Sequence, residues 1–326
     1  MKKSILKKFV STLIIVLLVL TQLNLVFNKS YAYKYELPEG TKLLLWSTKT
    51  RYDSDISAFI SNVTTGYQTI YEGQLTITNS VNSDSSRSTL PDLDEYALVF
   101  IILPTEAPTD AEIQQMKRYV NRGGRLVFIA ENNGYARSQN AILSEIANKL
   151  GANFTIDDGS YGSPKFGYVS ERNSASRLYS ETIEQDYVAP ILYSGDVEWV
   201  YKVVDPRYNN PNGSHDVVWC VDESAGRGKI TVVSDVNWAE NPTVANFNPE
   251  TCYEFLRLLL EDSLRNIEQT VSIKNYEAGT TNPIVGSEIS LCDKDGNILK
   301  DKNNFTICHS FTPFALQNDR FLVFFA

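Results

Sequence analysis

The chain has 326 residues, of which 43% are hydrophobic and 21% charged, and its net charge is −9. The first 32 residues hold five lysines and no acids, so the remainder carries a net charge of −14. That charge repels phosphate backbones and anionic headgroups, which argues against nucleic acid and peripheral membrane partners. The length fits one large domain and a small additional segment.

The N-terminus has the layout of a secretory signal. Four lysines (Lys2, Lys3, Lys7 and Lys8) precede an apolar run at 9–20 that continues weakly to residue 27, and Ser30-Tyr31-Ala32 follows. This order predicts a signal peptide at residues 1–32 and a mature start at Tyr33. The alternative is an uncleaved anchor, because 9–27 is nearly long enough to span a bilayer. Both interpretations place the rest of the chain at the cell surface or outside the cell.

Apolar runs then alternate with helical periodicity. Residues 42–46 predict a strand buried on both faces, and 53–63 predict a helix that Gly66 ends. A weaker strand is expected at 67–77, a loop at 79–87 and a strong strand at 96–103.

The second half continues the alternation. Thr109 and Glu112 form a capping box for a helix that Gly123-Gly124 ends. The remaining expected elements, in chain order, are a strand at 125–130, a helix at 139–150, added strand structure at 193–204, a hairpin of 217–221 with 229–233, and a last helix capped by Asn248 with Pro249.

Strands alternating with helices indicate right-handed crossovers and a mostly parallel sheet. We therefore expect an α/β fold at residues 33–268, doubly wound and flavodoxin-like. No G-x-G-x-x-G follows the first strand, so no dinucleotide and no other cofactor is predicted. Residues 269–326 show hairpin patterning and predict a small β segment.

One block resembles a known superfamily. Asp94-Glu95-Tyr96 leads into the strong strand, followed by the Pro104 break, the Glu112 helix and Gly123-Gly124, and later by the motif 228–235. Together these segments resemble the class I glutamine amidotransferase-like superfamily, in the branch found in exported and surface-associated proteins. The resemblance implies the fold over roughly residues 42–266.

That superfamily's enzymes carry a nucleophilic cysteine at the turn after a strand and a histidine later. Here the corresponding turn is Glu131-Asn132-Asn133-Gly134, and the two histidines are His215 in a loop and His309 in the tail. The catalytic cysteine and histidine are therefore not carried over. The resemblance implies the fold without that chemistry, and we predict no catalytic residue of this type.

The tail has a weaker resemblance. Residues 283–291, followed by Asp293-Lys294-Asp295-Gly296, look like the opening of a collagen-adhesin B-type repeat. The resemblance implies a truncated immunoglobulin-like repeat at 269–326. The same acidic stretch partly resembles a calcium loop, but its glycine is at the fourth position, which a hairpin turn explains better.

Four cysteines (Cys220, Cys252, Cys292 and Cys308) lie beyond the signal segment. An oxidising compartment permits disulfides, and four cysteines allow three pairings. Cys220 and Cys252 either meet in space or are two separate buried thiols. Since no close C-x-x-C pair is present, no metal site is predicted.

Ligands of such sheets bind beyond the carboxyl ends of the strands. Polar residues follow several predicted strands there, and the candidate ligand-binding set is Thr48, Arg51, Thr105, Glu106, Glu131, Asn132, Asp235 and Asn237. A carbohydrate suits this lining, with Trp46 or Trp238 stacking on a sugar. The alternative is that these residues cap helices and turns.

Three functions remain open. The first is an exported, non-catalytic domain that binds a small molecule, such as a carbohydrate, or a surface protein. The second is a secreted hydrolase of sugars or cell-wall material that uses Glu131 and Asp235 as paired carboxylates. The third is a structural module of a larger surface protein.

Overall fold

The computed structural model describes residues 37–50, 54–81, 86–162, 168–169, 171–180, 183–210, 213–239, 252–266, 288–290 and 308–310. The chain divides into two compact units, Met1–Ile267 and Glu268–Ala326. The predicted signal segment lies outside the described residues. Among the helices that are described, none is long and apolar enough to cross a membrane.

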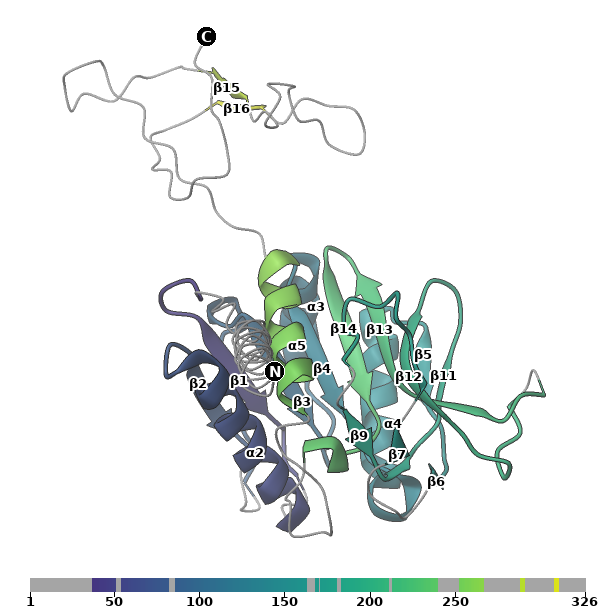
Figure 1. Cartoon of the computed structure of the whole chain (residues 1–326). Coiled ribbons are helices and arrows are strands. Elements are labelled where there is room, and N and C mark those ends of the chain that lie inside the picture. Colours follow the sequence, from purple (N-terminus) through teal and green to yellow (C-terminus); the bar gives the residue numbers. More distant parts are fainter. Residues whose placement is uncertain are drawn as a thin grey trace, which may run out of the picture. The chain divides into compact units, whose positions relative to one another are not determined.

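An eight-stranded sheet forms the centre of the first unit (Figure 1). Its parallel part runs in the order β2 (Thr76–Ser80), β1 (Lys42–Trp46), β3 (Leu98–Ile102), β4 (Arg125–Ile129) and β14 (Gly228–Val233). Its antiparallel part continues with β13 (Asp216–Ala225), β12 (Glu198–Val204) and β8 (Glu171–Arg172).

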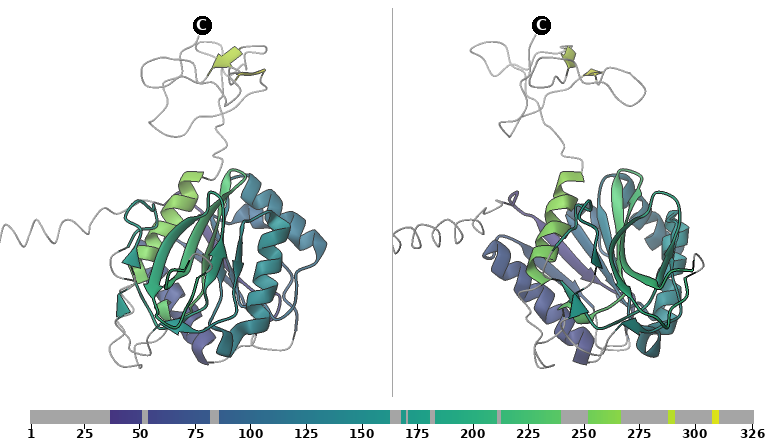
Figure 2. Two further views of the ribbon diagram at one scale, coloured as in Figure 1. Left: turned by 90° about the vertical axis from the view of Figure 1, so that its right-hand side faces the viewer. Right: turned by 45° about the vertical axis from the view of Figure 1, so that its right-hand side comes forward.

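Helices cover both faces of this sheet (Figure 2). On one face α2 (Ser54–Tyr71) and α5 (Tyr253–Asn266) pack on alternate strand residues such as Leu43 and Leu45. On the other face α3 (Asp110–Asn121) and α4 (Asn133–Leu150) pack on the intervening residues, such as Leu44. Strands buried on both faces read as continuous apolar runs, which explains the sequence pattern.

The predicted α/β class, doubly wound and mostly parallel, is confirmed. The parallel order is the flavodoxin-like one, and chain direction across the sheet reverses between β1 and β3. In the described residues of the connection from β2 to β3, 81 and 86–97, the only helix is the short 3-10 helix η1 (Leu93–Glu95).

The predicted end of the first helix is wrong. Helix α2 continues through Gly66 to Tyr71, and β2 starts only at Thr76. Gly66 is buried where α2 meets α5, and a Cβ there would come within 2.8 Å of the Leu256 side chain. The glycine therefore allows close helix packing, a tertiary requirement that its local sequence does not reveal.

Of the later helices, the predicted start of α3 is right and that of α4 is wrong. The capping box of α3 is confirmed: the Glu112 backbone N–H donates to the Thr109 hydroxyl, and the Glu112 carboxylate accepts from the Thr109 N–H. Helix α4 begins at Asn133 rather than at residue 139, with Asn132 as its N-cap. The predicted cap of α5 at 248–249 lies outside the described residues.

The region without clear periodicity holds several short strands. They are β5 (Phe154–Ile156), β6 (Tyr161–Gly162), β7 (Tyr168–Val169), β9 (Glu184–Gln185), β10 (Tyr187–Val188) and β11 (Ile191–Tyr193). They form three antiparallel pairs, β5 with β11, β6 with β10 and β7 with β9. Such two- and three-residue strands are too short to leave a period-2 pattern.

In the second unit, β15 (Glu288–Ser290) pairs antiparallel with β16 (Cys308–Ser310). The hairpin turn predicted at residues 293–296 lies outside the described residues. Cys220 and Cys252, in the first unit, are both buried and not joined by a disulfide.

Candidate ligand-binding edge

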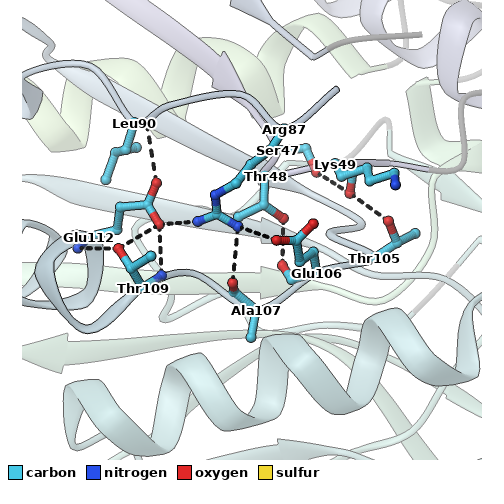
Figure 3. A network of polar contacts seen from close by, with 10 residues as sticks. All are labelled: Ser47, Thr48, Lys49, Arg87, Leu90, Thr105, Glu106, Ala107, Thr109 and Glu112. Carbon is cyan, nitrogen blue, oxygen red and sulfur yellow. Dashed lines mark hydrogen bonds and ion pairs between the residues drawn. The ribbon is translucent and has the colours of Figure 1, made fainter. Parts of the chain in front are cut away.

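The carboxyl ends of β1 and β3 meet at the point where strand order reverses, and Thr48, Thr105 and Glu106 lie there. The Thr48 hydroxyl donates to the Glu106 backbone oxygen at 2.5 Å. The Thr105 N–H and hydroxyl both donate to the Lys49 carbonyl, at 2.6 and 3.0 Å (Figure 3). These three predicted site residues therefore join the two strand-end loops to each other.

Arg87, the last residue of the loop predicted at 79–87, completes this cluster and was not among the candidate residues. Its guanidinium donates to the Glu106 carboxylate at 3.0 Å and to the Ala107 carbonyl at 3.2 Å, and it also bridges to Glu112 (Figure 3). A lone cation in a Ser/Asn/Asp-rich segment was the only available signal. The Glu106 side chain is half exposed, so water and salt weaken its ion pair with Arg87.

The backbone at this point is unusual. Leu103, directly after β3, has a φ of +38°, which non-glycine residues seldom adopt. The Thr50 hydroxyl donates to the Leu103 carbonyl at 3.1 Å, and Thr50 forms a bridge with Pro104. The two loops are thus held together by backbone as well as side-chain contacts.

The second group of predicted residues lies at the ends of β4 and β14. Glu131 is 5% exposed, and its Oε1 accepts from the Asn132 N–H at 2.7 Å and from the Asn132 amide at 2.5 Å. Its Oε2 accepts from the Val236 N–H at 3.0 Å. The Glu131 carboxylate therefore links the turn after β4 to the turn after β14.

Asp235 makes the matching links and is fully buried. Its Oδ1 accepts from the Asn237 N–H at 2.8 Å, and its Oδ2 accepts from the Asp186 N–H at 2.9 Å. Burial, followed by the nearby charge of Glu131, raises the pKa of Asp235 well above its usual range. The structure thus brings together the two carboxylates that the hydrolase hypothesis pairs.

Of the other candidates, Asn132 caps α4 by accepting from the Gly134 N–H at 3.0 Å. Asn237 begins the 3-10 helix η2 (Asn237–Ala239), and its amide lies 3.5 Å from Asp186 Oδ2. Arg51 lies outside the described residues, so its predicted place at this edge stays a prediction.

The predicted stacking of a tryptophan on a sugar is wrong. Trp46 and Trp238 are both fully buried. Trp238 packs edge-on against Phe59 and Phe255, with ring centroids 5.5 and 5.3 Å away. A large aromatic side chain next to a strand end is as useful for filling the core under α2 and α5 as for meeting a ligand.

Sequence reasoning also missed Gln185 and Asp186, in β9 and directly after it. The Asp186 N–H donates to the Asp235 carboxylate at this edge, and Gln185 precedes it in the chain. Their segment has no periodicity, so no strand end could be assigned there. Within the described residues, no group of three or more potential ligands could hold a metal ion.

Comparison with known proteins identifies no family. No family model matches the sequence, and no curated protein matches it. The N-terminal domain of mmIFT52 is 15% identical over 68% of this chain and 97% of its own, with a TM-score of 0.47. A ThuA-like protein from Bacteroides uniformis is 15% identical over 72% of this chain and 93% of its own, with a TM-score of 0.43.

A β-galactosidase from Bacillus circulans sp. alkalophilus is 9% identical over 85% of this chain, with a TM-score of 0.44. This chain spans only 41% of that enzyme. Similarities of this size indicate no function for the chain. Any functional conclusion therefore depends on the geometry at the carboxyl edge of its own sheet.

Proposed function

We propose that the chain is an exported, non-catalytic binding domain of the glutamine amidotransferase-like fold, which takes its ligand or partner at the carboxyl edge of the sheet. One observation carries the non-catalytic part. Both oxygens of Glu131 and both of Asp235 accept hydrogen bonds from N–H groups of the chain itself. A general acid or base must reach the proton that it transfers, and these buried groups face the protein.

Export is supported by the lysines, apolar run and Ser30-Tyr31-Ala32 of the N-terminus. Binding at the edge is supported by Tyr135, on the first turn of α4, a residue that is 62% exposed. Exposed tyrosines offer a rigid apolar face and a hydroxyl, and they are enriched where proteins bind partners.

The hydrolase hypothesis has one observation in its favour. A buried Asp235 with a raised pKa beside a second carboxylate is the usual arrangement of an acid and base pair. Its burial opposes this role, because a glycosidic oxygen would have to reach an oxygen that already accepts from the Asn237 N–H. We therefore place the hydrolase second.

A thermal-shift screen of the purified protein against sugars, amino acids and cell-wall fragments tests the binding function. A ligand at one hundred times its dissociation constant should stabilise the fold by about 2.7 kcal/mol. Tyr135→Ala should weaken the shift, whereas Tyr193→Ala, which removes an exposed tyrosine from β11, should leave it unchanged.

Turnover of any bound sugar or cell-wall fragment by the wild-type protein, lost in Asp235→Asn, would favour the hydrolase instead. A shift that Tyr135→Ala and Tyr193→Ala leave equally strong would contradict binding at the carboxyl edge.

A further inference from the structure

The two edge strands of the eight-stranded sheet differ in length and in charge. At one edge, β8 has two residues, Glu171 and Arg172, and both are charged. At the other edge, β2 has five residues, all of them Thr, Ile, Asn or Ser, and none is charged. Short length and charged side chains are usual means by which proteins keep an edge strand from pairing with another chain. The β2 edge uses neither of them.

The register with β1 determines which backbone groups of β2 point away from the sheet. The Thr76 N–H donates to the Thr41 carbonyl at 3.1 Å, so Thr76 directs its backbone groups towards β1. Because these groups alternate in direction along a strand, Thr78 does the same, whereas Ile77 and Asn79 direct their N–H and carbonyl groups outwards. Among the described strands, none pairs with this outer side of β2.

These outward groups are complementary to themselves across a twofold axis. When Thr78 faces Thr78 of a second copy in an antiparallel pair, Ile77 lies opposite Asn79 of that copy. Each of the two Ile77 and Asn79 pairs then exchanges two N–H···O bonds. The four bonds use every outward N–H and carbonyl of both strands, so the strand matches itself in this register.

Helix α2, which covers the β2 end of one sheet face beside α5, is also nearly without charge (Figure 1). Asp55 is the single charged residue among its 18, whereas α3 has four charged residues among 12. The exposed residues of α2 are all polar and neutral: Ser54, Ser61, Thr65, Gln68 and Thr69. Charged residues are depleted at the centre of protein interfaces. In a chain with a net charge of −9, repulsion opposes contact between two copies least at such a surface.

We propose that two copies of this chain associate through β2, as an antiparallel pair centred on Thr78 that joins their two eight-stranded sheets. The α2 helices of both copies then lie on the same side of the joined sheet and extend the contact beyond the strands. A twofold contact uses the same surface of both partners, as the self-matching register of β2 requires. The proposal does not depend on ligand binding at the carboxyl edge, because β2 pairs along its side.

Sedimentation equilibrium of the purified full chain tests the association. We expect wild type to have twice the mass of the 36.7 kDa chain and Asn79→Pro to be a monomer, because proline has no N–H to donate at this edge. The Asn79 N–H points away from β1, so this proline breaks no bond of the sheet. Asn79→Ala is the matched control. Both variants lose the bond from the Val81 N–H to Asn79 Oδ1, at 3.0 Å, but alanine keeps its backbone N–H and should remain a dimer.

Cysteine cross-linking tests the register without a proline. In a Cys292→Ser, Cys308→Ser background, Thr78→Cys should join two copies by a disulfide on oxidation, because residues facing each other in this type of pair have Cα atoms about 4.5 Å apart. Thr76→Cys is the control, since two copies of residue 76 lie roughly 14 Å apart in this register, which is too far for a disulfide.

Three results would overturn the proposal. The first is a wild-type chain that stays monomeric at every concentration at which it is soluble. The second is a dimer that Asn79→Pro leaves intact, which would place the contact elsewhere. The third is cross-linking that is equal for Thr76→Cys and Thr78→Cys.

Discussion

Asp235 is an ionisable group with no exposed surface, so its protonation is linked to stability. Its pKa is higher in the folded protein than in the unfolded chain. Between those two values the folded state binds more protons, and its contribution is present below the unfolded pKa and lost as pH rises through the folded one. Asn at this position does not titrate.

We therefore expect the free energy of unfolding of wild type, relative to Asp235→Asn, to decline as pH rises above the ordinary pKa of an aspartate, about 4. Urea unfolding at several pH values measures this difference.

Asp205 should show the opposite pH dependence, because its hydrogen bonds from Arg207 lower its pKa. Wild type should lose stability relative to Asp205→Asn as pH falls below about 4. A pH-independent difference for Asp235→Asn would contradict its raised pKa.

For single residues, the sequence predicted where the candidate site residues lie better than what they contact. Thr48, Glu131 and Asp235 were placed at strand ends from the strand pattern alone, and they do lie there. Their partners could not be predicted, because the Val236 N–H reaches Glu131 across 105 residues of sequence. Gln185 was missed because its strand has only two residues and leaves no periodic pattern in the sequence.

Among the elements, Arg125 joins α5 to the sheet. It is fully buried at the start of β4, and its guanidinium donates to Asp222 of β13 at 2.6 Å and pairs with Asp262 of α5. Strand periodicity marked Arg125 only as the first residue of an apolar run. A charged residue opening such a strand was the available signal, and only the packing of α5 supplies its partner.

Arg125→Met should destabilise the protein by about 3–5 kcal/mol, because it leaves two buried carboxylates without this cation. Lys42→Met breaks an exposed ion pair with Glu95, which solvent screens, and should destabilise the protein far less. Chemical denaturation of both variants compares them. Equal losses would show that the Arg125 network does not hold α5 in place.

For the whole molecule, the alternation of strands and helices was enough to predict the doubly wound sheet. The extent of α2 was not predictable, because Gly66 looks like a terminator in sequence and lies in a helix contact in space. The strands of two or three residues between β4 and β12 could not be predicted either, because they are too short to show a period in the sequence. Local pattern thus accounts for the parallel sheet, and tertiary contacts account for what covers its edge.

The two thiols of the first unit report on global unfolding. Burial raises the pKa of Cys252 to about 12 and raises that of Cys220 as well. In a Cys292→Ser, Cys308→Ser double variant, we expect both thiols to resist a thiol reagent when native and to react without reductant when unfolded. Absence of reactive thiols after unfolding would mean that they are joined by a disulfide.

The central claim is that the strand-end carboxylates hold loops together and perform no catalysis. Urea unfolding of Glu131→Gln, compared with wild type, tests it most directly. The glutamine amide cannot accept from every N–H that Glu131 now satisfies, so we predict a loss of about 1–3 kcal/mol. A variant as stable as wild type, or more stable, would contradict this, because replacing a catalytic carboxylate commonly relieves strain at an active site.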